Sequence, residues 1–75
     1  MNYLTIKIDL RDAKLASECI LDDRYLFNKL TRTYSDVWYF ENDDPDLIED
    51  VEIAIIETLD NGCINYEIKK QLEVD

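Results

Sequence analysis

The sequence predicts a small α+β domain, a two-layer α/β arrangement in which a three-stranded sheet carries two or three helices packed on one face, in the order β-α-(α)-β-α-β. Apolar and polar residues alternate over 3–10 and again over 63–68, and apolar residues recur at helical spacing over 47–59. The 75 residues form a single compact domain, 1–75, because a chain of this length buries one modest core, and 47% of its residues are hydrophobic.

The first strand is expected at residues 3–10, where positions 4, 6, 8 and 10 are apolar and the positions between them are polar. This period of two is typical of a strand with one buried face. Lys7 and Asp9 interrupt the segment, so it differs from the apolar stretch of a secretory signal. The handedness rule for crossover connections favours a central place for this strand in the sheet.

A helix is expected from about Asp12 to Asp22, because apolar residues recur there at helical spacing and Asp9 or Asp12 can cap its N-terminus. If this helix continued, Asp23 would fall on its apolar side. We therefore expect a break at Asp22-Asp23, followed by a shorter helix or turn over residues 25–30.

Residues 36–40 are dense in β-favouring side chains and predict a second strand, buried on both faces or beside an interface. A longer helix is predicted from Pro45 to about Asp60. Asp44 is a good N-cap for it, and proline at the first helical position loses no hydrogen bond.

The end of this helix is also marked in the sequence. Asn61-Gly62 predicts a left-handed C-terminal stop, because glycine adopts that conformation without steric cost. The third strand is expected at residues 63–68, with Leu72 and Val74 as an extension.

Charge is the unusual property of the chain. It has 18 acidic and 8 basic residues and no histidine, which gives a net charge of −10. Residues 1–32 have a net charge of +1, whereas residues 33–75 have a net charge of −11. Direct binding to nucleic acid or to an anionic membrane is therefore electrostatically disfavoured. The longest uninterrupted apolar runs are four residues, such as 53–56, which is far too short to span a membrane.

The residue types argue against catalysis. Without histidine the usual proton shuttle at neutral pH is missing, and a single glycine excludes the phosphate-binding loops. Cys19 and Cys63, 44 residues apart, do not make a zinc site and are typical of reduced thiols in a cytosolic protein. Residues 42–46 carry oxygen ligands, but Leu47 and Ile53 occupy the glycine and glutamate positions of a calcium loop, which favours a capped helix start. We expect no enzyme, no cofactor and no metal.

The predicted long helix has one acidic face. The helix macrodipole accounts for acids near its start, but not for Glu57 and Asp60 near its end. Like-charged residues three or four positions apart cost roughly 0.2–0.5 kcal/mol per pair, and no base offsets them within the helix. Ile53, with Ile56 beside it, adds an apolar anchor at the centre of this face. The expected partner-binding residues are Asp43, Asp44, Asp46, Glu49, Asp50, Ile53, Glu57 and Asp60.

Six of the eight aromatic residues lie between Tyr25 and Phe40. Most of this cluster is expected to fill the core, because so small a chain needs the apolar area. One face of the strand at 36–40 could remain for a partner, so Tyr34, Trp38 and Tyr39 are secondary partner-binding candidates.

In size, charge and strand–helix layout the chain resembles small acidic inhibitors that phages and mobile elements direct against DNA-handling host enzymes: uracil-DNA glycosylase inhibitor, anti-restriction proteins and several anti-CRISPR proteins. The resemblance covers no aligned motif, and no residue is carried over from it. The expected function is that of a DNA-mimic inhibitor whose acidic helix occupies the nucleic-acid-binding surface of a basic partner, a nucleic-acid-handling enzyme or complex. The expected location is the cytoplasm, which is the host cytoplasm for a phage-encoded protein.

Two alternatives remain open from the sequence. The first is an immunity or antitoxin-type protein that neutralises a basic toxin through a mixed acidic and aromatic surface, in which Tyr34, Trp38 or Tyr39 would dominate. The second is a small adaptor subunit of a larger assembly, in which a neighbour buries Ile53 and Ile56. Either a monomer or a homodimer is compatible with the sequence.

Overall fold

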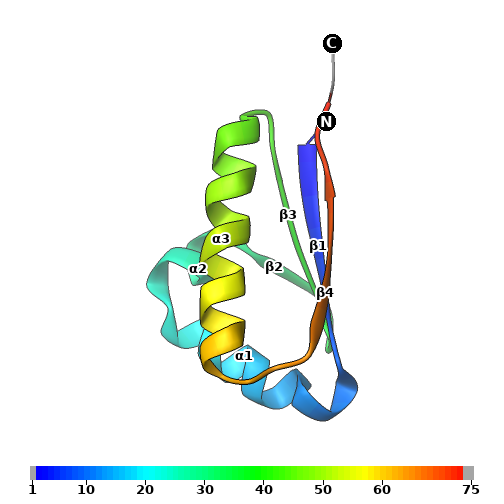
Figure 1. The fold of residues 1–75 in the computed structure, drawn as a ribbon, viewed down its shortest axis with the longest axis vertical. Coiled ribbons are helices and arrows are strands. Elements are labelled where there is room, and N and C mark those ends of the chain that lie inside the picture. The colour runs from blue at the N-terminus through cyan, green and yellow to red at the C-terminus, as the bar shows by residue number, and fades with distance from the viewer. Residues whose placement is uncertain (1, 74–75) are drawn as a thin grey trace.

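The computed structural model describes residues 2–73 and shows a small α+β fold in which the helices cover one face of an antiparallel sheet (Figure 1). In chain order the elements are β1 (Asn2–Ile8), the 3-10 turn η1 (Leu10–Asp12), α1 (Ala13–Asp22), α2 (Arg24–Lys29), β2 (Thr31–Tyr34), β3 (Val37–Asn42), α3 (Pro45–Asn61) and β4 (Tyr66–Gln71). The α+β class is confirmed. The prediction of three strands, and the element order that follows from it, is wrong: the structure has a fourth strand, β2, between α2 and β3.

The four strands lie in the order β2-β3-β1-β4, and each neighbouring pair is antiparallel. The expected central place of β1 is confirmed, since it pairs with β3 on one side and β4 on the other. In the register, Ile6 lies opposite Trp38 of β3 and Ile68 of β4, so these three side chains share the helix-covered face.

The missed strand β2 lacks the usual sequence signals. All four of its residues are exposed, so no buried position creates an alternating pattern. It joins β3 through the turn at Ser35-Asp36, which contains no glycine or proline, and its register with β3 is irregular between Arg32 and Tyr34. The strand predicted at 36–40 is present, displaced by one or two residues, as β3.

The expected helix boundaries in the first half are confirmed. Asp23 lies between α1 and α2 and interrupts the helical conformation. Its carboxylate accepts hydrogen bonds from the backbone N–H groups of Tyr25 and Leu26 and so caps α2. Asp9 caps η1 by accepting from the N–H of Arg11. Asp12 holds the N-cap position of α1, but its side chain makes no capping bond to that helix.

The long helix is confirmed, but the predicted left-handed stop at Gly62 is wrong. Gly62 has φ −87°, and Cys63 has the positive φ of 54°. The helix ends in a Schellman motif, in which the Ile64 N–H bonds the Leu59 carbonyl at 3.0 Å and the Cys63 N–H bonds the Asp60 carbonyl at 3.1 Å. A Cβ at position 62 would lie 3.0 Å from Cδ1 of Ile64, so a larger residue there requires that side chain to shift.

The last strand starts later than predicted. Residues 63–65 complete the helix end and its return to the sheet, and β4 begins only at Tyr66. Leu72 lies just beyond the strand and packs on the core, whereas the expected extension at Val74 lies outside the described residues.

The core lies between the sheet and the helices that cover it, of which α3 contributes four fully buried side chains. Fully buried aliphatic side chains of β1, such as Leu4 and Ile6, meet those of α3, such as Ile48 and Ile55. Burying each such side chain contributes about 1.5–3 kcal/mol, so this contact is the main attachment of α3. With one side of α3 fixed against the sheet, its opposite side projects into solvent. None of the helices within residues 2–73 is long and apolar enough to cross a membrane.

Candidate partner-binding surface

The outer side of α3 and the turn before it form a continuous acidic stretch, which we call the acidic surface. All eight predicted partner-binding residues are exposed there: Asp43, Asp44, Asp46, Glu49, Asp50, Ile53, Glu57 and Asp60. At 1.5 Å per residue, the part from Asp46 to Asp60 spans about 21 Å along the helix. One element therefore presents most of these residues on a rigid axis.

The turn that starts the acidic surface is fixed by local hydrogen bonds. The Asn42 side-chain oxygen accepts from the Asp44 N–H at 2.9 Å, and the Asp44 carboxylate accepts from the Asp46 N–H at 3.0 Å. The buried Asn2 side chain donates to the Asp43 carbonyl at 3.0 Å. Asp44 thus has a structural role as the helix cap, which leaves Asp43 and Asp46 as outward charges at this end.

Lys70 of β4 borders the acidic surface, and sequence reasoning missed it. Its Nζ lies 3.0 Å from a carboxylate oxygen of Glu52 and 4.0 Å from one of Glu49. The register places Lys70 opposite the buried Leu4, on the helix side of the sheet. Only sheet pairing brings this base to α3, since it lies 18 residues after Glu52. The acidic surface is therefore neutralised along one flank and uncompensated along its centre.

The C-terminal end of the acidic surface is tied to β4. The Tyr66 hydroxyl donates to the Asp60 carboxylate at 2.9 Å. Partial burial, and then the hydrogen bond to Asp60, raises the pKa of the Tyr66 hydroxyl above its ordinary value of 10.0. This contact positions Asp60 without removing its negative charge.

Ile53 is the apolar member of the acidic surface. Its side chain is 55% exposed, while its neighbour Ile56 is half-buried. A single exposed isoleucine is ordinary on a protein surface. Here it lies at the centre of a helix face whose other outward residues are carboxylates, which is the position of an anchor in an interface.

The secondary candidates do not form one site. Trp38 is 4% exposed and lies in the core, with the Arg32 guanidinium 5.5 Å from its ring centre, so it offers no surface to a partner. Tyr34 is 70% exposed on β2. Tyr39 is half-buried and stacks on Tyr3, with ring centres 6.0 Å apart.

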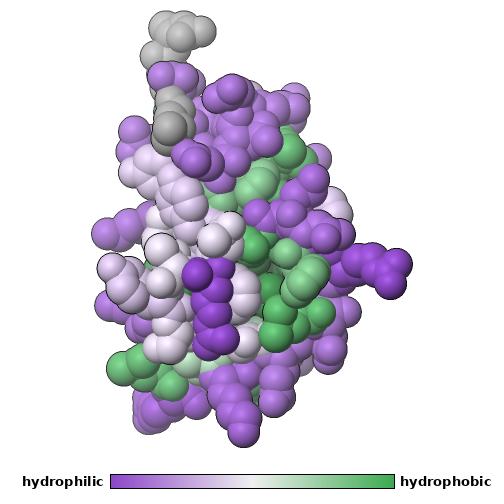
Figure 2. Space-filling model, turned by 180° about the vertical axis from the view of Figure 1, so that it is seen from behind, coloured by the Kyte–Doolittle hydropathy of each residue, from purple (hydrophilic) through white to green (hydrophobic). Residues whose placement is uncertain are grey.

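Tyr39 belongs to the face of the sheet that no helix covers, which we call the open face. Figure 2 shows the side of the molecule turned away from α3, where weakly polar side chains gather over the strands and apolar ones lie beside them over the helices. Partial burial and the neighbouring Glu41 carboxylate raise the pKa of the Tyr39 hydroxyl. Leu15 and Leu21 of α1 and Phe27 of α2 are about half-exposed, and sequence reasoning did not single them out.

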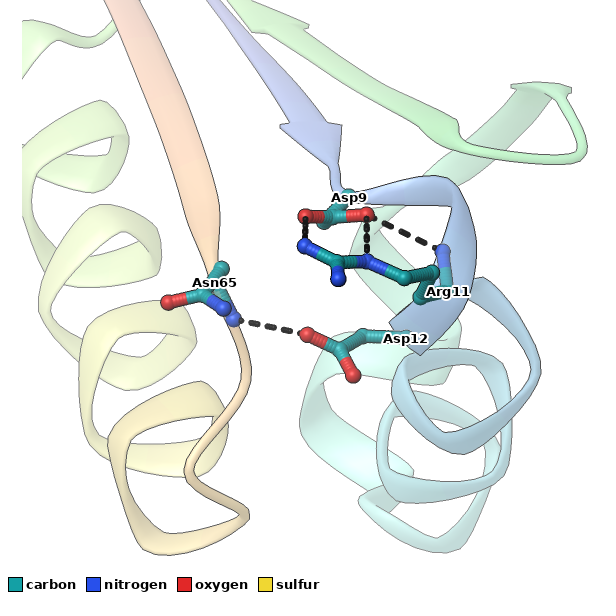
Figure 3. Close-up of polar contacts among 4 residues, drawn as sticks. All are labelled: Asp9, Arg11, Asp12 and Asn65. Atoms are coloured by element: carbon teal, nitrogen blue, oxygen red, sulfur yellow. Dashed lines mark hydrogen bonds and ion pairs between the residues drawn. The ribbon is translucent and has the colours of Figure 1, made fainter.

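A polar junction ties the start of β4 to the end of β1 (Figure 3). The Arg11 guanidinium bonds the Asp9 carboxylate, and the shortest of these contacts is 3.2 Å. The Asp12 carboxylate accepts from the Asn65 N–H at 3.1 Å, and the Asp9 N–H donates to the Asn65 carbonyl at 3.0 Å. The hydrogen bond and charge of Arg11 lower the pKa of Asp9 below its ordinary value of 3.8. A hollow of about 330 Å³ beside the junction includes Lys7 and Glu67 in its wall.

This junction is structural in character. It contains carboxylates, a guanidinium and an amide, but no thiol or imidazole that could act as a nucleophile or proton shuttle at neutral pH. Among the residues that the structure describes, no three carboxylate or thiol side chains form a group that could hold a metal ion. The acidic surface is thus the strongest candidate for function.

Compared with models of protein families and with curated proteins, the chain matches none of them.

Proposed function

We propose that the protein is an inhibitor that binds the basic, nucleic-acid-binding surface of a partner protein and competes there with DNA or RNA. The single observation that carries this proposal is the acidic surface: seven exposed carboxylate residues and the exposed Ile53 on α3 and the turn that begins it. The partner is a nucleic-acid-handling enzyme or complex, and the two proteins meet in the cytoplasm.

The charge of the acidic surface supports an electrostatic partner. Carboxylates three or four residues apart on a helix lie about 5–6 Å from one another, a spacing suited to a groove that accepts successive phosphates. Charge of one sign attracts a basic groove over a distance and speeds association at low salt.

Solvation alone is a weaker account of the same surface. A helix that needs only solubility gains stability from alternating signs, because opposite charges four residues apart attract each other. The α3 sequence contains no base, and Lys70 compensates only the flank at Glu49 and Glu52. Asp46, Asp50 and Glu57 carry self-repulsion that lysine at neighbouring positions would have removed.

Ile53 supports contact with a protein groove that has an apolar site among its basic groups. Electrostatic attraction gives speed and orientation, whereas much of the binding energy of an interface comes from a few side chains that become buried. An exposed isoleucine at the centre of the acidic surface supplies such a side chain.

A second candidate function is an immunity or antitoxin-type protein that uses its aromatic residues. The observation that favours it is Tyr34, which is 70% exposed and has no burial to explain an aromatic residue on an edge strand. In this case a Tyr34→Ala variant would lose the partner and reversal of the acidic surface would have a smaller effect.

The test is affinity capture with three forms of the protein from a host-cell lysate. The first is the wild type, the second carries Glu49→Lys, Asp50→Lys and Glu57→Lys, and the third is a charge-matched control. The control reverses three exposed acids away from α3: Glu18, Asp22 and Glu41. Circular dichroism checks that both variants remain folded, and mass spectrometry identifies the captured proteins at low and high salt.

We expect the wild type and the control to capture a nuclease, helicase or glycosylase at low salt, and the α3 variant to capture none. High salt should release the partner, since the contact is electrostatic. Capture by the α3 variant at the wild-type level would contradict the proposal, and so would equal loss in both variants. Recovery of no partner at either salt would count against any inhibitor.

A further inference from the structure

The strand β4 is an edge of the sheet, and its outer side is a row of backbone groups that no other strand in residues 2–73 pairs (Figure 1). Such an edge is a template for another strand. The opposite edge, β2, is less suited because it has only four residues and an irregular register.

The hydrogen bonds of β1 show which residues of β4 face outward. The Asp9 N–H donates to the Asn65 carbonyl, and the Ile8 N–H donates to the Asp36 carbonyl on the β3 side. Backbone direction alternates along a strand. Residues 65, 67, 69 and 71 therefore face β1, and Tyr66, Ile68 and Lys70 direct their N–H and C=O groups away from the sheet.

This alternation restricts how two copies of β4 can pair about a two-fold axis. The outward residues must meet one another, so the axis can pass through Glu67, Ile68 or Lys69. Through Ile68, all three outward residues of each strand pair: Ile68 with its symmetry mate and Tyr66 with Lys70. Either of the other two registers leaves one outward residue of each strand without a partner.

Side-chain charge selects the same register. An axis through Glu67 places Glu67 directly opposite itself, and an axis through Lys69 places Lys69 opposite itself. With the axis through Ile68, Glu67 of each copy lies opposite Lys69 of the other on the open face, which gives two symmetric ion pairs. Lysine on an edge usually discourages pairing, but here an acid two residues away makes the strand complementary to itself.

We infer that β4 is a homodimerisation strand: two copies of the chain pair antiparallel about Ile68, with Glu67 and Lys69 forming reciprocal ion pairs, and the two sheets join into one of eight strands. The inference rests on the register and on these two charges, and it is independent of the proposed function. The net charge of −10 per chain opposes association, so the dimer is weak at low salt.

The dimer places both α3 helices on the same side of the joined sheet. Since α3 packs on β1 and β3, the two helices lie about 20 Å apart, at about 4.8 Å per strand spacing. Two acidic surfaces then face one direction, related by the two-fold axis. A partner with a long basic groove, or two grooves, would contact both.

The test is sedimentation analysis of the purified chain at about 0.15 M salt, where the Debye length is about 8 Å. We expect a monomer–dimer equilibrium between roughly 10 μM and 1 mM, the range of a weak specific contact. Glu67→Lys and Lys69→Glu are the two single variants. Each replaces two ion pairs with two like-charged contacts and should weaken the dimer about tenfold or more.

The two single variants also provide the control. In a mixture, Lys at 67 and Lys at 69 of one chain meet Glu at 69 and Glu at 67 of the other, so a heterodimer should form although neither variant dimerises well alone. The double variant Glu67→Lys/Lys69→Glu should dimerise like the wild type. If Glu67→Lys is unstable because Lys7 lies opposite it, the Lys69→Glu variant and the double variant still make the comparison.

Hydrogen exchange gives a second measurement that needs no substitution. The amides of Tyr66, Ile68 and Lys70 should become more protected as the protein concentration rises, while those of β2 should not. A wild-type chain that stays monomeric to about 1 mM would overturn the inference. Single variants that dimerise as well as the wild type, or a mixture that forms no heterodimer, would overturn it too.

Discussion

The acids on α3 and the acids around the sheet have different surroundings in the fold. Around the sheet, several acids have a partner or an opposite charge across from them: Asp9 bonds Arg11, Asp12 accepts from Asn65, and Glu67 lies opposite Lys7 in the register. On α3, the carboxylates of Asp46, Asp50 and Glu57 are exposed on a helix with no base of its own. The negative charges of the protein therefore differ in their effect on its stability, depending on whether an opposite charge or a donor lies nearby.

An acidic composition can therefore include two kinds of carboxylate, those that stabilise the fold and those that do not. A paired carboxylate stabilises the fold that positions it, whereas like-charged carboxylates beyond the first turn of a helix slightly destabilise that helix. The acids around the sheet belong to the architecture. The acids of α3 are better explained by something outside the chain, which is the reason for the proposed function.

The largest effect is expected where α3 meets the core, and it tests whether the outer side has a hidden structural role. Ile55→Ala should lower the free energy of unfolding by about 2–5 kcal/mol, because Ile55 is fully buried and its truncation leaves a cavity. Ile53→Ala, two residues away and exposed, should change it by less than about 0.5 kcal/mol. Urea denaturation measures both. A large loss at Ile53 would break the comparison, because the outer side would then stabilise the fold.

Charge reversal should have a smaller effect on the free energy of unfolding, and the sign of this effect should differ between α3 and the sheet. Glu57→Lys should raise the free energy of unfolding by about 0.5–1 kcal/mol, because it removes repulsion with Asp60 and places a cation near the C-terminus of α3. Glu67→Lys should lower it by up to about 1 kcal/mol, since it puts like charges opposite one another at Lys7. Thermal unfolding at low protein concentration compares the two. Equal responses would show that the acids of α3 are as well compensated as those of the sheet.

The smallest effect concerns pH at the junction of β1 and β4. Arg11 holds the pKa of Asp9 below its ordinary value of 3.8, so this pair stabilises the fold above about that pH and ceases to do so as pH falls through the lowered pKa. Asp9→Asn should therefore be less stable than the wild type near neutral pH, and the difference should shrink on acidification from about pH 5 to about pH 2.5. Urea midpoints across that range measure it. A difference that is constant with pH would show that the Asp9 charge has no role.

Much of the fold was predictable from the sequence because its signals are local. The alternation in β1, the Asp23 break and the Asp44-Pro45 start of α3 all depend on residues within a few positions of one another. The strand β2 was not predictable in this way. Its four residues are all exposed, and it is held mainly by pairing with β3 rather than by a buried face of its own.

The candidate site was predicted in part for the same reason. Helical periodicity placed the acids of α3 on one side, and the structure finds those residues exposed. Periodicity could not reveal Lys70, which reaches Glu52 through the pairing of β4 with β1, nor could it choose which aromatic residues of the 34–40 segment enter the core. The structure buries Trp38 and exposes Tyr34.

By itself, the sequence determined the α+β class, the helix limits, the concentration of charge in residues 33–75 and its alignment along one helix face, because these properties depend on composition and on spacing along the chain. Only the tertiary structure decided the fourth strand, the order β2-β3-β1-β4 and the contact of Lys70 with α3. It also decided which residues of β4 direct their backbone N–H and C=O groups away from the sheet, namely Tyr66, Ile68 and Lys70. Each of these depends on pairing between segments far apart in the chain. The physical reason is that a sheet register is a long-range choice, made by the packing of the whole core and not by any one segment.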